Sequence, residues 1–487
     1  MREYGEQYCS LTEKEVSTID CEIRVAFYTL GCKVNQYDTE SLLQELTSAG
    51  YKLVDFSEAA DVYFVNSCAV TTEAARKSRQ MVRRAKKRNS EAKIVLLGCY
   101  PQAMESLGED AEYDRQLISQ LPVDLFCGME QREKLLELTE HLLQSEHQKS
   151  DCIRGLWSKK DRLSGWPALG ISGFSELQRP VVKVQEGCEE FCAYCLIPYA
   201  RGPMRSRPVE EVVSEVSRLV QAGYSEIVLA GIHLAAYGRD DSNNSCSLSS
   251  LLRKVAHIGG DWRLRLSSVE PIDLSEELFA VMSEYERIVP HLHIPLQSGS
   301  DRILRLMGRR YSTFEFEGLV ARAREYVSNL GLTTDVMVGF PGETKEDHRH
   351  SLEFVRGLGF SRIHVFPFSE RPGTRAYYMS EKVDGKAKNH RRDEMLKLAD
   401  ESACQFHQSQ VNRCEEVLLE RKTAIPSDLS DYSRECDEKI EVYFGYTSNY
   451  IPAWVIDGNH QCTSGEIISV KLSGAALSGC LAAPMDD

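Results

Sequence analysis

The sequence of 487 residues has no apolar run that approaches the length needed to cross a membrane, which takes about 20 residues. Residues 1–22 also lack the basic start and the apolar stretch of a signal peptide. No internal repeat or low-complexity tract is present. These absences predict a cytoplasmic protein built from globular domains, and a chain of this length is expected to form two to four of them.

The sequence also lacks an excess of positive charge. Its 73 acidic and 58 basic residues give a net charge of −15, which argues against a nucleic-acid partner because phosphate binding needs positive surface. The distribution is uneven, however. Residues 76–88, RKSRQMVRRAKKR, carry eight basic residues and no acidic one. A stretch of this kind is as often a solvated helix face as a binding surface, so charge alone decides nothing.

Sixteen cysteines are spread along the chain, and without a signal peptide they are expected to be reduced. Cys188, Cys192 and Cys195 are the most informative, because they are spaced Cys-x3-Cys-x2-Cys with no fourth cysteine nearby. Structural zinc takes four ligands in a closed tetrahedron. A [4Fe–4S] cluster held by three thiolates instead leaves one iron open to another ligand. The triplet therefore favours an iron–sulfur cluster.

Residues 23–140 alternate between apolar strands and helices. The strands IRVAFYTLG, VYFVNSC and KIVLLGC are separated by helical stretches, which predicts a parallel sheet. Each strand leads to a cysteine, Cys32, Cys68 or Cys99, and the carboxyl ends of such strands meet at one edge. Any one of these thiols could be a small buried hydrophobe. Three matching placements favour a second site with three sulfur ligands.

A second strand–helix alternation follows a polar linker at 141–178. Its six strand candidates are PVVKVQE, EIVLAGI, WRLRLSS, HLHIPLQ, TTDVMVGF and RIHVFPF. Six such units predict a partial TIM-type (βα)6 barrel whose site lies at the carboxyl ends of the strands, where the triplet falls. Residues 405–475 alternate apolar and polar side chains between glycine-containing turns, which predicts a small β-barrel. The last dozen residues are interpreted as a frayed tail.

These features together are similar to the methylthiotransferase family of radical S-adenosylmethionine (SAM) enzymes. The resemblance covers residues 23–475 and is carried by FYTLGCKVNQYDTE, VNSCAVTTEAARKSRQ, LLGCYPQ and GCEEFCAYC. It implies an α/β protein with a parallel N-terminal domain at 23–140, a (βα)6 radical SAM barrel at 179–402 and an RNA-binding β-barrel called TRAM at 405–475. Two [4Fe–4S] clusters are implied, an auxiliary cluster on Cys32, Cys68 and Cys99 and a SAM cluster on Cys188, Cys192 and Cys195.

Within this family the motif wording is similar to the branch that modifies N6-threonylcarbamoyladenosine in tRNA. Lys33 and Val34 follow the first N-terminal cysteine, where the isopentenyladenosine branch usually has Gln-Met and the ribosomal-aspartate branch has a proline at the first position. The implied reaction adds a methylthio group to C2 of the modified adenosine next to the anticodon. The SAM cluster would generate a 5′-deoxyadenosyl radical from SAM, and the auxiliary cluster would hold the sulfur.

The resemblance also points to residues at the ends of barrel strands as SAM contacts, since buried polar groups there need a partner or a ligand. For His233, packing at the barrel mouth is about equally expected. No catalytic side chain is identified. The candidate SAM contacts are Gly231, His233, Ser268, Glu270, Gln297 and Asp335.

The implied partners are the tRNA anticodon loop and an electron donor such as a flavodoxin or ferredoxin, for a monomer that binds no membrane. Three alternatives stay open. A methylthiotransferase for N6-isopentenyladenosine or for a ribosomal aspartate needs the same six cysteines, and a non-catalytic RNA-binding protein would hold zinc or no metal. A B12-dependent radical enzyme is disfavoured, because residues 23–140 contain no cobalamin-binding histidine motif.

Overall fold

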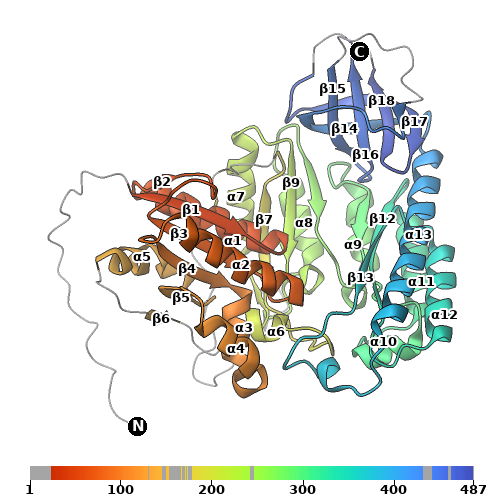
Figure 1. Ribbon diagram of the computed structural model, residues 1–487. Coiled ribbons are helices and arrows are strands. Elements are labelled where there is room, and N and C mark those ends of the chain that lie inside the picture. The colour runs from red at the N-terminus through yellow and green to blue at the C-terminus, as the bar shows by residue number, and fades with distance from the viewer. Residues whose placement is uncertain are drawn as a thin grey trace.

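The computed structural model shows an N-terminal domain, a central barrel and a smaller β-barrel that follow one another along the chain (Figure 1). Among the residues that the structure describes, no helix is both long and apolar enough to cross a membrane. Residues 1–22, where a signal-peptide pattern is lacking, lie outside the described residues. The structure describes residues 23–129, 131–144, 150–152, 166, 170, 171, 173, 178–241, 246–430, 441–458 and 462–485.

The N-terminal domain is built on a six-stranded sheet in the order β2-β1-β3-β4-β5-β6, with every pair parallel. The central strand β3 is buried along its whole length, as expected for a parallel sheet covered on both faces. The predicted parallel α/β domain is thereby confirmed. The strands are β1 Arg24–Thr29, β2 Lys52–Leu53, β3 Val62–Ser67, β4 Lys93–Gly98, β5 Leu125–Cys127 and β6 Ser150–Cys152, and the helices are α1 Lys33–Ser48, α2 Thr72–Arg88, α3 Cys99–Leu107, α4 Glu112–Ser119 and α5 Leu135–Gln144.

One strand of this sheet lies beyond residue 140. β6 pairs with β5 and falls in the segment interpreted as a polar linker. A three-residue edge strand carries too few residues to display a hydrophobic period, so the sequence pattern does not reveal it.

The central domain contains six parallel strands in the order β7-β9-β10-β11-β12-β13. Hydrogen-bonded ladders join the first three and the last three, and the bridges Leu264↔Ile288 and Ser268↔His293 connect the two groups. The predicted (βα)6 barrel is confirmed, with α1 of the N-terminal domain beside β7 (Figure 1). The strands are β7 Val181–Glu186, β8 Arg205–Ser206 (antiparallel to β7), β9 Glu226–Gly231, β10 Arg263–Leu266, β11 His291–His293, β12 Gly331–Val338 and β13 Arg362–Pro367, and the helices are α6 Ile197–Arg201, α7 Val209–Gln221, α8 Leu248–Ala256, α9 Glu276–Glu284, α10 Asp301–Met307, α11 Thr313–Tyr326, α12 Lys345–Leu358 and α13 Gly385–Ser409.

The last domain is a closed five-stranded barrel in the order β14-β15-β16-β18-β17, which confirms the predicted small β-barrel. The interpretation of the last dozen residues as a frayed tail was wrong, because β18 pairs with both β16 and β17. The first four residues of β18 are all buried, so this strand shows none of the alternation by which half-buried strands are recognised. The strands are β14 Cys414–Lys422, β15 Glu441–Thr447, β16 Pro452–Asp457, β17 Ile467–Ala476 and β18 Gly479–Pro484.

A buried carboxylate anchors the small barrel to the central one. Glu226 accepts hydrogen bonds from Arg263 Nε at 2.6 Å and Arg265 Nε at 2.7 Å. The same guanidinium groups donate to the backbone carbonyls of Tyr446 and Thr447 in β15. Burial favours the neutral acid, but the two arginines outweigh it and hold the pKa of Glu226 well below its usual range. The charged carboxylate therefore orients both arginines toward the small barrel.

Candidate cluster and cofactor site

Cys32, Cys68 and Cys99 lie together at the carboxyl edge of the N-terminal sheet. Cys68 directly follows β3, Cys99 opens α3 directly after the neighbouring strand β4, and Cys32 caps α1 behind β1 on the other side of β3. Gly31 has φ +109°, and a Cβ there would lie 3.3 Å from the sulfur of Cys68. The backbone before Cys32 thus approaches Cys68 closely, in a conformation that favours glycine.

Burial favours the neutral form of the Cys68 and Cys99 thiols. Together with the neighbouring Cys99 and Cys32, it raises the pKa of Cys68 to about 12. Burial also raises the pKa of Cys99, although the Arg201 guanidinium opposes it. Metal ions bind thiolates and displace their protons, so a cluster would relieve the cost of placing three thiols here. Three sulfur donors without a fourth fit a [4Fe–4S] cluster that keeps one open iron.

Asn35 and Arg201 position this edge, and neither was among the predicted site residues. Asn35 Nδ2 donates to the carbonyls of Leu30 at 2.7 Å and Ser67 at 3.1 Å, the residues that lead into Cys32 and Cys68. Arg201 Nε lies 3.3 Å from the sulfur of Cys99 and donates to it. The signal for Asn35 is its place three residues after a motif cysteine. Arg201 belongs to the other domain, so only the tertiary structure reveals its role.

The second triplet lies in the loop after β7, the first barrel strand. The Ile197 N–H donates to Cys195 Sγ at 3.4 Å, and the Cys195 N–H to the Cys192 carbonyl at 3.0 Å. Gly187 has φ +75°, and a Cβ there would lie 1.9 Å from the carbonyl oxygen of Pro203. The loop therefore folds tightly on itself. Three thiols in a loop of eight residues suit one cluster with an open iron.

Charged residues surround the second triplet. Arg309 Nη1 lies 3.5 Å from Cys192 Sγ, and Arg309 also forms an ion pair with Glu270. His233 is buried, with Nδ1 3.9 Å from Cys188 Sγ and Nε2 2.7 Å from a carboxylate oxygen of Asp273. Burial raises the pKa of Cys192 while Arg309 counteracts it. Arg309 thus favours negative charge on the Cys192 sulfur, as a thiolate-bound cluster requires.

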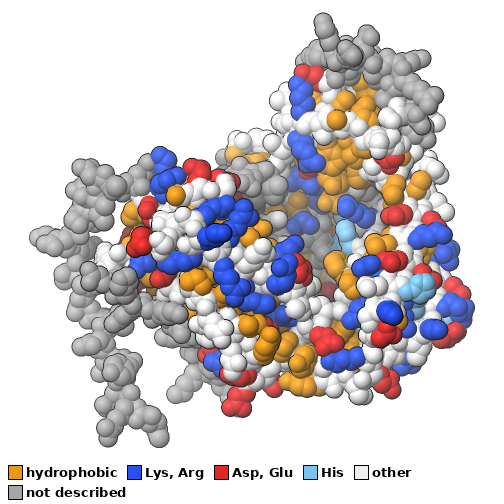
Figure 2. Space-filling model, viewed as in Figure 1, with side chains coloured by type: hydrophobic (Ala, Val, Ile, Leu, Met, Phe, Trp, Pro, Cys, Tyr) orange, Lys and Arg blue, Asp and Glu red, His pale blue; other side chains and the backbone are white. Residues whose placement is uncertain are grey.

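A cavity of about 960 Å³ lies where the three domains meet. It runs from Cys32 through the interior of the central barrel, past Gly231 and Arg265, to Tyr450 of the small barrel, and Ile197, two residues after Cys195, also lines it. Figure 2 shows the hollow between the N-terminal domain and the barrel, with basic and histidine side chains at its wall. All three domains thus contribute to one cavity, in which reactants can be held together.

The predicted SAM contacts fall into two groups around this cavity. Gly231, Ser268 and Asp335 line it, and Asp335 lies 3.3 Å from His293 Nε2. The remaining three do not appear in its wall. His233 and Glu270 lie beside the cysteine triplet as described, and the backbone of Gln297, at φ +67°, bridges to β12 through the Asp335 carbonyl. Contact with SAM stays a prediction for all six.

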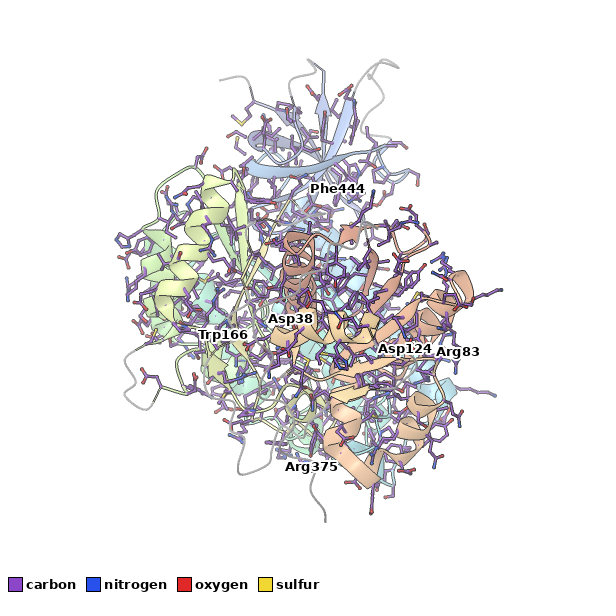
Figure 3. All side chains as sticks on the ribbon, turned by 90° about the vertical axis from the view of Figure 1, so that its left-hand side faces the viewer. Asp38, Arg83, Asp124, Trp166, Arg375 and Phe444 are labelled. Carbon is purple, nitrogen blue, oxygen red and sulfur yellow. The ribbon has the colours of Figure 1, made fainter. Side chains whose placement is uncertain are left out.

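Five buried charges fill the boundary between the N-terminal domain and the barrel. Asp38 on α1 accepts a hydrogen bond from Lys183 at Oδ1, and its Oδ2 pairs with both Arg201 and Arg132. Glu186 at the end of β7 pairs with all three cations. Figure 3 places Asp38 where the two domains meet. The three cations outweigh burial and lower the pKa of both carboxyl groups. Asp38 and Glu186 are therefore charged, and ion pairs join the two domains.

The aromatic residues of the small barrel also have partners within the protein. Tyr446 and Tyr450 stack with their ring centroids 4.6 Å apart, and Arg179 lies over both rings. Tyr443 is buried in the barrel core. Trp454 packs against Phe444 at 5.1 Å between centroids. Packing in the barrel core and at the domain interface therefore accounts for these four side chains. Stacking on nucleic-acid bases is not needed to explain them.

Two family models match the chain. Residues 24–119 match "Uncharacterized protein family UPF0004", and residues 182–355 match the "Radical SAM superfamily". The first interval contains Cys32, Cys68 and Cys99, and the second contains the complete Cys188 triplet. Both sets of thiols therefore lie in the matched parts.

Curated proteins match over most of the chain. "Threonylcarbamoyladenosine tRNA methylthiotransferase MtaB" of Bacillus subtilis is 37% identical over 92% of this chain and 93% of its own length. The protein of that name from Aquifex aeolicus is 36% identical over 85% and 97%. "tRNA-2-methylthio-N(6)-dimethylallyladenosine synthase" of Syntrophotalea carbinolica is 33% identical over 81% and 88%. Among solved structures, the radical SAM methyltransferase TsrM from Kitasatospora setae shares the fold, with a TM-score of 0.52 and 14% identity over 73% and 74% of the two chains.

Proposed function

This chain belongs to the radical SAM methylthiotransferase family, and we therefore propose that it adds a methylthio group to C2 of N6-threonylcarbamoyladenosine next to the anticodon of tRNA. The observation that carries the proposal is the similarity of this chain, along nearly its whole length, to threonylcarbamoyladenosine tRNA methylthiotransferases. The six cysteines form two sets of three, and Cys32 of the first set lines the cavity at the junction of the domains, which supports a reaction with two cluster sites.

The proposed cofactors are SAM and two [4Fe–4S] clusters. Cys188, Cys192 and Cys195 would hold the cluster that binds SAM, and the three cysteines of the N-terminal sheet would hold the auxiliary cluster. When bound, these groups supply radical and sulfur chemistry that no side chain can provide.

The chain's own residues would hold the clusters, orient the reactants and line the cavity. Arg309 and Arg201 place N–H groups on the sulfurs of Cys192 and Cys99, one at each set. Such charge-assisted hydrogen bonds fix the ligands and stabilise the thiolate form. The cavity beside Cys32, to which all three domains contribute, would keep the reactants together.

The proposed reaction has a direct test. The reconstituted enzyme would be incubated without oxygen with SAM, reductant, sulfide and tRNA, and the nucleosides would be analysed by mass spectrometry. Gain of one methylthio group on threonylcarbamoyladenosine alone is expected. Gain only on isopentenyladenosine, tested in parallel, would overturn the substrate assignment, and no gain on either would overturn the proposed reaction.

For tRNA binding we propose the exposed face of α2 as a phosphate-binding surface. Arg83, Arg84 and Lys87 are exposed on this helix, and basic side chains gather over the N-terminal domain in Figure 2. Figure 3 shows Arg83 at the outer edge of the domain. Since the small-barrel aromatics are packed internally, backbone contacts on α2 would supply much of the affinity.

Replacing Arg83, Arg84 and Lys87 together by glutamine is expected to weaken tRNA binding. Each phosphate contact contributes about 0.7 to 0.9 to the slope of log affinity against log salt concentration, so the slope should fall by about one to three. Titration at several salt concentrations measures it. Lys397→Gln, which removes an exposed charge from α13, is the control. An unchanged slope in the triple variant would exclude this surface.

The proposal also includes the setting of the reaction. An electron donor such as a flavodoxin or ferredoxin would reduce the SAM site, and the enzyme would act as a monomer in the cytoplasm. The approach of a tRNA and of a small electron carrier both require open surface beside the cavity.

A further inference from the structure

Lys33 occupies a distinctive place in the cavity wall, directly after Cys32. Its side chain is exposed, and in the described part of the chain it forms no hydrogen bond or ion pair. Two other cations of the wall have carboxylate partners, Arg265 with Glu226 and Arg179 with Glu420 at 2.7 Å, and Arg421 lies over the ring of Phe444. Lys33 is the cation of this wall that directly follows Cys32, and among the described residues it has no counter-ion.

The positive charge of Lys33 acts on Tyr450, which also lines the cavity. Burial raises the pKa of Tyr450, but Arg179, Lys33 and Arg265 outweigh it, so the pKa falls below its ordinary value. A lowered pKa means that the surroundings favour a negative charge on the phenol oxygen. The same surroundings would favour the charge of an anionic ligand.

Neutral hydrogen-bonding groups face the same space. Burial, together with Arg362 and His293, lowers the pKa of His364 to about 4, so the imidazole is neutral at pH 7. Two acidic groups line the cavity, and each has a partner: Asp335 lies 3.3 Å from His293 Nε2, and Glu420 pairs with Arg179. Neither carboxylate balances the Lys33 ammonium.

We propose that Lys33 binds the carboxylate of the threonylcarbamoyl group and thereby selects the substrate, an inference that rests on the proposed function. The threonylcarbamoyl group ends in a carboxylate and a hydroxyl, whereas the dimethylallyl group is a hydrocarbon. The ring carbons C2 and C6 flank N1, so the tail on N6 leaves the ring near the reacting carbon. A residue next to Cys32 is accordingly well placed to reach that tail. A hydrocarbon tail would leave the ammonium desolvated and unpaired, which selects against it.

The test compares wild type with Lys33→Gln, using the reconstituted enzyme without reductant so that only binding is read. Anticodon stem-loops carrying threonylcarbamoyladenosine, its methyl ester or isopentenyladenosine are titrated. Loss of one charge-assisted hydrogen bond should weaken binding of the carboxylate form about 10- to 100-fold, and should leave the ester and isopentenyl forms unchanged. Lys33→Arg should retain most of the affinity, and Lys397→Gln is the matched charge control.

The possible outcomes separate the explanations. Equal weakening for the acid and its ester would overturn the proposal, and so would weaker SAM binding with unchanged stem-loop binding, which would assign Lys33 to the SAM carboxylate. Iron content equal to that of wild type shows that Cys32 is undisturbed. If wild type binds and modifies threonylcarbamoyladenosine while Lys33→Gln behaves the same, only this inference fails. If wild type modifies no such tRNA, the proposed function itself fails.

Discussion

Replacing Cys32, Cys68 and Cys99 together by alanine is expected to abolish methylthio transfer to tRNA, while 5′-deoxyadenosine continues to form from SAM. The three thiols are the proposed ligands of the auxiliary cluster, and the Cys188 triplet lies in another domain with its own hydrogen bonds. Measuring iron content, 5′-deoxyadenosine and modified nucleoside in the same samples separates the two sites. The variant should retain about half of the iron.

Cys127→Ala provides a matched control for this experiment. Cys127 is also a buried cysteine, and it ends β5, the strand next to β4. Because Cys127 belongs to neither set, its replacement should leave the amounts of 5′-deoxyadenosine and modified nucleoside unchanged. The protein itself should lose only a little stability. Modified tRNA made by the triple variant would contradict the assignment of the auxiliary ligands, and loss of 5′-deoxyadenosine in that variant would contradict the independence of the two sites.

Arg201→Leu is expected to destabilise the junction of the N-terminal domain and the barrel by about 3–5 kcal/mol, because Asp38 and Glu186 would remain buried with one cation fewer. Hydrogen exchange is the suitable measurement, since unfolding of a multidomain metalloprotein is not two-state. Amides of α1 and β7 should exchange faster by a factor of about 100 or more, the equivalent of 3 kcal/mol.

Arg218→Leu is the control for this prediction. Arg218 is half-exposed and lies 3.8 Å from the buried Glu215, which keeps Arg207 as a closer partner at 2.9 Å. Loss of the solvent-screened Arg218 should therefore cost only about 0–1 kcal/mol. If Arg201→Leu accelerates exchange no more than Arg218→Leu, the buried charges do not hold the domains together. Faster exchange limited to the small barrel would likewise contradict the prediction, because Arg201 is remote from that domain in the packing described.

The sequence predicts the three-domain fold well because its long elements are strongly patterned. The six barrel strands are apolar segments bounded by helices, and each matches an observed strand. The missed strands include the two-residue β2 and β8 and two strands without a visible period, β6 and β18. A strand buried on both faces near a chain end carries no alternation, and its place in the barrel depends on pairing with β16 and β17.

Part of the candidate site was likewise predictable from the sequence, and part was not. Motif spacing predicts both cysteine sets, since each set follows strand ends that the pattern reveals. Arg132, Asp38 and Arg201 could not be foreseen, because they come from three distant parts of the chain and meet only when the domains pack. Lys183 and Glu186 left a faint signal as charges inside an apolar strand. Pairing partners for such charges require the tertiary structure.

The hydrogen bond from Arg201 to Cys99 has a consequence for the order in which the protein matures. Its donor lies 102 residues after its acceptor in the chain and belongs to the next domain. During synthesis, Cys32, Cys68 and Cys99 emerge from the ribosome well before the helix that carries Arg201. The N-terminal domain can form its sheet early, but the environment of its thiols is complete only after the barrel has docked. If these thiols hold the proposed auxiliary cluster, its loading would follow docking of the barrel and so be coupled to assembly of the two domains.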